Sequence, residues 1–203
     1  MGQLVDEPLP DTGNPRIIDY ATQHRSDFVD VFLPGQCRFF LASASGYQQV
    51  PVLFGRPVAT AHLLPLVPNQ TGAQSLYIPK LFRNKQTGEY LTYDECFSAM
   101  GDPKDYPVTP WDSFELNETD TYAPEDNSPI DVLDLCRDMF EQLEGVTPIV
   151  EALEYQRLYM DKFFRNNEDF HQYGPRISPR FAYKYRHLID PTLSGNIDAG
   201  AIN

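Results

Sequence analysis

The stretch of residues 38–61 constrains the fold of this chain more than any other. It begins with a short apolar run, residues 39–41, which predicts a strand buried on both faces of a sheet. Four small residues, 43–46, follow and favour a sharp turn of the backbone. Apolar side chains at helical spacing then predict a helix over residues 47–54, and the apolar run 57–61 predicts a second strand. Together these pieces form a βαβ unit.

A βαβ unit places its first turn at the carboxyl edge of a parallel sheet. Free backbone N–H groups and the positive end of a helix dipole lie there, so the position suits an anion. We therefore predict that Ser43, Ser45, Gly46 and the backbone N–H of Tyr47 form an anion-binding turn. The alternative is that these small residues only allow the strand and the helix to pack closely.

Composition excludes several classes of protein. The chain has 203 residues, 41% of them hydrophobic and 13% aromatic, which predicts one large domain with a substantial core. Its formal net charge of -13 argues against nucleic acid or an anionic membrane surface as the main partner. The sequence has no signal-peptide pattern and no long apolar run, which predicts a cytoplasmic protein without a transmembrane segment.

Three cysteines, Cys37, Cys96 and Cys136, lie far apart within hydrophobic patterns. An odd number at this spacing favours reduced core residues over a disulfide framework or a zinc site. No metal site is therefore expected.

Strands and helices are predicted to alternate with short connections, which is typical of a parallel sheet with helices on both faces. The predicted fold class is α/β, a Rossmann-like sheet followed by a C-terminal helical segment. We divide the chain into a lead-in loop (1–15), a Rossmann-like α/β region (16–123), C-terminal helices that pack on it (124–190) and a flexible tail (191–203).

Further elements follow from local signals in the chain. A short strand is predicted at 16–20 and an extended piece at 76–80, and a long acidic surface loop, pinned by Trp111, at 101–123. Helices are predicted from Ser26 or Asp27 to Leu33, over 93–100 after a capping box from Thr92 to Glu95, from Ser128 to Gly145, from Thr147 onward, and over 180–188.

The order of several short motifs resembles a family of bacterial glycosyltransferases assigned to surface-carbohydrate assembly. The motifs are Ile18-Asp-Tyr20, Asp30-Val-Phe-Leu33, Cys37-Arg-Phe-Phe-Leu41, Ser45-Gly46, Val50-Pro-x-Leu-Phe-Gly-x-Pro57, Ile78-Pro-Lys80, Glu125-Asp-Asn127 and Ile177-Ser-Pro-Arg-Phe181. The resemblance covers residues 16–190, and its specificity lies in the order of the motifs, since each motif alone is weak.

The resemblance implies a fold of the two-Rossmann-domain (GT-B) type, of which this chain is similar to the C-terminal, donor-binding half. It implies that region 16–123 binds a nucleoside-diphosphate sugar as substrate, with the diphosphate held by Ser43, Ser45, Gly46 and the Tyr47 N–H. It also implies no obligatory metal or other cofactor, and a separate or missing N-terminal domain as partner. At His62 the chain departs from the pattern, because the family has an asparagine before the next proline. This departure concerns the usual contact with the sugar.

Other side chains have both a binding and a structural interpretation. Lys80 and His62 follow predicted strands and could contact a phosphate or a sugar. Alternatively, Lys80 is a solvated residue at the end of a strand, and His62 is a structural histidine. Arg176 and Arg180 could return to the same crevice. Asp131, in the first turn of a capped helix, is expected to stabilise that helix. No residue is assigned a catalytic role.

Two functions of different class remain open. The first is a donor-binding glycosyltransferase domain, whose activity needs an N-terminal acceptor domain. The second is a non-catalytic remnant or protein-interaction module that keeps the α/β fold. A relative of sugar-nucleotide epimerases would share the phosphate turn but needs acidic groups that the predicted crevice lacks. The chain has no Gly-x-Gly-x-x-Gly, P-loop, Gly-x-Ser-x-Gly, His-Glu-x-x-His or Asp-x-Asp motif.

Overall fold

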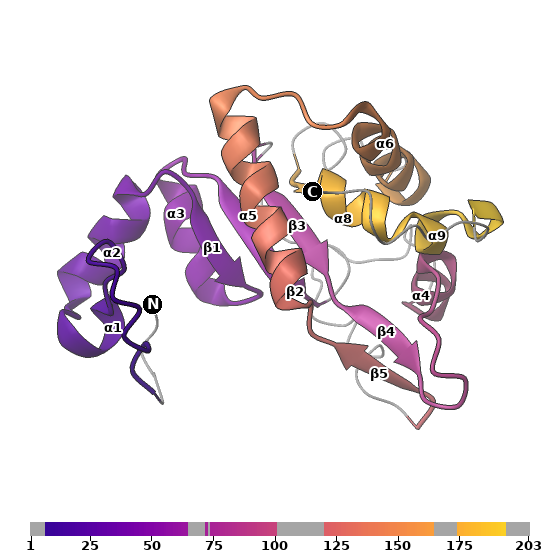
Figure 1. The fold of residues 1–203 in the computed structure, drawn as a ribbon, viewed down its shortest axis with the longest axis horizontal. Helices are drawn as coiled ribbons and strands as arrows, with labels where there is room; N and C mark the ends of the chain where they lie inside the picture. The colour runs from indigo at the N-terminus through magenta and orange to yellow at the C-terminus, as the bar shows by residue number, and fades with distance from the viewer. Residues whose placement is uncertain (1–6, 65–71, 73, 101–119, 165–173, 194–203) are drawn as a thin grey trace.

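The computed structural model describes residues 7–64, 72, 74–100, 120–164 and 174–193, and its fold is mixed α/β (Figure 1). A parallel sheet of four strands runs in the order β1 (Phe40–Ser43), β2 (Val58–Leu63), β3 (Leu76–Pro79) and β6 (Arg176–Ile177). Helices flank this sheet, so the predicted Rossmann-like α/β class is confirmed. The strands follow one another across the sheet in the same order as along the chain.

The predicted βαβ unit is present with small changes. After β1 come a 3₁₀ turn, η1 (Gly46–Gln48), and a short helix, α3 (Gln49–Leu53). Gly55 follows with a φ of 67°, a left-handed conformation that suits glycine after a helix end. One expectation was wrong: β1 is an edge strand with β2 as its neighbour, and its Leu41 is 45% exposed. An apolar run alone does not distinguish an edge strand from a central one.

Helices cover opposite faces of the sheet. Thr60 of β2 contacts Gln48 of η1, whereas its neighbours Ala59 and Ala61 belong to a core that includes Leu135 of α5 (Pro129–Glu144). Because successive side chains of a strand point to opposite faces, η1 and α5 lie on different sides. In Figure 1, α5 runs across β2 and β3 on the near side.

The N-terminal elements differ from the prediction at one point. Instead of a strand at 16–20, the chain forms a helix, α1 (Tyr20–Gln23), because the Asp19 side chain accepts a hydrogen bond from the Thr22 N–H and caps a helical turn. Helix α2 (Asp27–Gln36) begins after Ser26, which caps it as predicted. It continues through Pro34 for two more residues.

Beyond β3 the chain adds elements that the sequence pattern did not predict. β4 (Leu81–Asn84) pairs antiparallel with β5 (Tyr122–Glu125), and β6 has two residues. Helix α4 (Tyr93–Met100) begins with the predicted capping box, whereas α6 (Val150–Phe164) begins later than expected. The helix predicted over 180–188 is divided into α8 (Pro179–Lys184) and α9 (Arg186–Ile189), followed by the 3₁₀ turn η4 (Pro191–Leu193).

The prediction of reduced core cysteines holds for Cys96 but is wrong about the burial of the other two. All three are free; Cys96 is buried in the core, and burial raises the pKa of its thiol to about 12. Cys37 and Cys136 are half-buried. The acidic stretch 101–119, with Trp111, lies outside the described residues, and so does most of the tail. Within the described ranges, no helix has the length and apolar character to cross a membrane.

Candidate functional site: the carboxyl edge of the parallel sheet

The register of the sheet brings the predicted site residues to one edge. Ser43 at the end of β1 lies opposite Ala61, and Leu63 at the end of β2 lies opposite Pro79 at the end of β3. His62 and Lys80 therefore lie at the carboxyl ends of neighbouring strands, and the turn after β1 lies beside them. This is the edge at which open α/β sheets bind ligands.

His62 has a strained backbone. Its φ of 54° places it in the left-handed region, and among the described residues it is the only non-glycine residue there. The register between β2 and β3 shifts between Thr60 and Leu63, so His62 lies in a bulge. A left-handed non-glycine residue costs about 1–2 kcal/mol, and such residues often occur at functional sites.

Asn127, which directly precedes the N-cap of α5, supports this bulge with three hydrogen bonds. Its Oδ1 accepts from the His62 N–H at 2.7 Å, and its Nδ2 donates to the Pro79 carbonyl at 2.7 Å. Its own backbone N–H donates to Nδ1 of His62 at 3.0 Å. The side chain of Asn127 is buried, and it connects the ends of β2 and β3 to the start of α5.

Lys80 forms an ion pair at the same place. Its Nζ lies 2.6 Å from Oδ1 of Asp126, and that oxygen lies 4.0 Å from Nδ1 of His62. The hydrogen bond and charge of Lys80, with a smaller contribution from His62, hold the pKa of the Asp126 carboxyl below its usual value. Asp126 is 69% exposed at its side chain, whereas Lys80 is 24% exposed, so the pair opens to solvent on the side of the carboxylate.

The turn after β1 offers backbone groups more than side chains. The first N–H groups of a helical turn have no partner within it, and the Ser45 side chain does not cap η1. The Tyr47 hydroxyl donates to the carbonyl of Asp30 and its ring packs against Phe40, so its side chain is already engaged. Among the described residues its backbone N–H has no hydrogen-bond partner and can serve a ligand. Gly46 has no positive φ, and a Cβ added to it meets open space. Glycine at this position therefore leaves room for a ligand to approach the turn, and no unusual backbone conformation requires it.

Two helical segments begin at this edge on opposite faces of the sheet, η1 after β1 and α5 after Asn127. The start of α5 is satisfied by its own residues: Ser128 and Asp131 exchange hydrogen bonds in a capping box. Asp131 therefore stabilises the helix as predicted, and the N-terminus of η1 is the less satisfied of the two.

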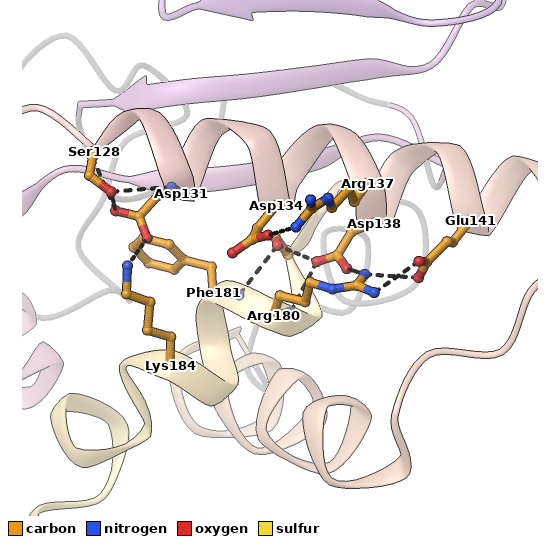
Figure 2. A network of polar contacts seen from close by, with 10 residues as sticks. Ser128, Asp131, Asp134, Arg137, Asp138, Glu141, Arg180, Phe181 and Lys184 are labelled. Carbon is orange, nitrogen blue, oxygen red and sulfur yellow. Dashed lines mark hydrogen bonds and ion pairs between the residues drawn. The ribbon is translucent and has the colours of Figure 1, made fainter. Parts of the chain in front are cut away.

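Other charged residues near α5 lie in a separate network on its flank (Figure 2). Asp131 pairs with Lys184 at 2.6 Å, and Asp138 accepts hydrogen bonds from Ser178 and from the backbone and guanidinium of Arg180. Arg180 thus joins α8 to α5 and does not reach the carboxyl edge. Arg176 begins β6, opposite Leu76 at the other end of β3.

The site contains two residues to which the sequence analysis gave no role, Asp126 and Asn127. The motif Glu125-Asp-Asn127 is visible in the sequence, but its contact with His62 is not, because the two residues lie 65 positions apart along the chain. Across the part of the chain that the structure describes, no group of three or more His, Cys, Asp or Glu residues is arranged to hold a metal ion. Comparisons with family models, curated proteins and solved structures found no match to this chain.

Proposed function

We propose that the carboxyl edge of the sheet binds a nucleoside-diphosphate sugar, and that the chain is the donor-binding half of a glycosyltransferase of the GT-B type acting in bacterial surface-glycan synthesis. The observation that carries this proposal is the arrangement of His62, Lys80 and Asp126 at the ends of neighbouring strands, with His62 held in a strained conformation by Asn127. Strain that three hydrogen bonds maintain at a sheet edge favours a binding role over a purely structural one.

The two parts of the edge suit different parts of such a ligand. The turn from Ser43 to Tyr47 offers backbone N–H groups without a counter-charge, which suit a diphosphate. The cluster of His62, Lys80 and Asp126 contains an ammonium beside a carboxylate, so its donors and acceptors suit sugar hydroxyls better than a phosphate.

In this proposal the chain contributes to transfer by positioning the donor and by stabilising charge on the leaving nucleoside diphosphate. The backbone N–H groups of the turn supply this stabilisation, because the charge of Lys80 is balanced by Asp126. The base that activates the acceptor would come from an N-terminal domain, and no metal is required.

A thermal-shift screen of the purified chain tests this function. The ligands are UDP, GDP, CDP, ADP and TDP, and the glucose conjugate of each. A ligand at 100 times its Kd adds about 2.7 kcal/mol of stability. In a chain of this size that corresponds to a rise in Tm of several degrees, at about 2–4 °C per kcal/mol. We expect a rise with one base.

Gly46→Val is the matched variant for this screen. A Cβ added at Gly46 meets open space in the folded protein, so we expect Tm without ligand to change little and the ligand-induced rise to disappear. A cooperative melt with no shift for any nucleotide would refute the binding proposal for the isolated chain. It would favour the alternative, a non-catalytic interaction module.

A further inference from the structure

The hydrogen bond between Asn127 and His62 determines more than the shape of the bulge. A backbone N–H can only donate, so the Nδ1 atom that it contacts at 3.0 Å must be the unprotonated nitrogen of the ring. Asp126 does not compete for Nδ1, because its nearer carboxylate oxygen lies 4.0 Å away, beyond hydrogen-bond distance. A neutral His62 in this arrangement carries its proton on Nε2.

We propose that Asn127 is a positioning residue that holds His62 as the Nε2–H tautomer, so that His62 serves the site as a neutral hydrogen-bond donor. The other two bonds of Asn127 make this effective. They hold the His62 backbone in its left-handed conformation and fix the end of β3, which keeps Nδ1 aligned with the Asn127 N–H.

This inference rests on the proposed function for its purpose, because it adds a specific role to the same site. A donor at Nε2 complements the acceptor oxygens of Asp126, and a sugar hydroxyl can accept from one group and donate to the other. His62 would then recognise the sugar and would not act as a base. The tautomer itself is a property of the free protein and can be measured without any ligand.

The test is long-range proton–nitrogen NMR of the uniformly ¹⁵N-labelled protein at a pH where His62 is neutral, with His62→Gln used to assign its signals. We expect the pattern of a single tautomer, with the proton on Nε2. In Asn127→Ala the backbone N–H remains but both side-chain bonds are lost, so we expect the Nε2–H preference to weaken toward a mixture of tautomers. Asp126→Asn is the matched control, because it alters the neighbouring residue and leaves the three Asn127 bonds in place.

The outcomes separate the inference from the proposed function. Protonation of Nδ1 in the wild-type protein, or an unchanged pattern in a folded Asn127→Ala, would overturn the positioning role even if a nucleotide sugar binds. If Asn127→Ala does not fold, Asn127→Asp replaces it, since this side chain can still accept from the His62 N–H but cannot donate to the Pro79 carbonyl. Failure of all nucleotides to bind, with the expected tautomers, would refute the function alone.

Discussion

Helix α5 connects two groups of charged residues that differ in almost every physical respect. On its flank, Asp131 and Asp138 are buried, and each carboxylate accepts several hydrogen bonds. The donors to Asp131 are Ser128, Lys184 and Tyr185, and those to Asp138 are Ser178 and Arg180. Shortly before the first residue of α5, Asp126 is largely exposed and pairs closely with Lys80, with His62 farther away at 4.0 Å. The first group joins two helices, whereas the second faces solvent at the edge where three strands end.

The difference separates a structural network from a candidate binding site. Burial raises the pKa of Asp138, and the bonds from Ser178 and Arg180 only partly offset this rise. These bonds satisfy the Asp138 carboxylate within the protein. At the carboxyl edge, the strained backbone of His62 is stabilised, among the described residues, by its hydrogen bonds to Asn127 alone. Shifted pKa values occur in both groups and do not distinguish them. Exposure and backbone geometry do.

The largest expected effect is on the buried network. Asp138 is 1% exposed, and Asp138→Ala leaves the Arg180 guanidinium with Glu141 alone and Ser178 without its acceptor. Breaking a buried ion pair in this way costs about 3 kcal/mol of folding free energy. Urea denaturation should show a lower midpoint with an unchanged slope.

Asp134→Ala is the matched control, since it removes the same charge from the same helix one turn earlier. Asp134 is half-buried and pairs with the exposed Arg137, three residues further along the helix, and such a pair contributes about 0.5 kcal/mol or less. Equal losses for the two variants would contradict the view that burial makes the flank of α5 a structural network (Figure 2).

A smaller effect is expected at His62, where the backbone conformation decides. Asparagine tolerates a left-handed φ, whereas valine, branched at Cβ, does not. We therefore expect His62→Val to be less stable than His62→Asn by about 1–2 kcal/mol, measured by the same denaturation experiment. Both variants lose the ring, so the difference isolates the strain. Equal stabilities would mean that the bulge relaxes easily and that its geometry is not held by Asn127.

Much of the fold follows from short-range signals. The parallel sheet was predictable because each of its first three strands is an apolar run beside a turn, and α5 because Ser128, Pro129 and Asp131 mark its start. The pairing of β4 with β5 was not predictable, because Leu81 and Glu125 are far apart along the chain. Each of these strands also has four residues, too few to show a clear hydrophobic period. Tyr185 breaks the last helix for no reason that its local sequence reveals.

The site was predictable to a similar degree. His62 and Lys80 could be placed at the carboxyl edge, since strand ends follow from the apolar runs that precede them. The contribution of Asp126 and Asn127 could not be placed, because it depends on how α5 docks against β2 and β3. The direction of the Tyr47 side chain, toward Asp30, depends in the same way on the packing of α2.

The smallest effect, and the most local, concerns the charge of Asp126. Lys80→Met removes the main cause of its lowered pKa, so that pKa should rise toward the ordinary value for aspartate. The sign for stability follows: a lowered pKa stabilises the fold above the ordinary aspartate value, and this contribution is lost as the pH falls through the lowered value. Carboxyl carbon NMR of both proteins between pH 2 and pH 6, a window roughly centred on that ordinary value, measures the change.

Glu125 is the internal control, because its lowered pKa depends first on Arg83 and should not move. A shift at Glu125 as large as that at Asp126 would show that the ion pair at the carboxyl edge is part of one larger network, and the contrast with the flank of α5 would then fail.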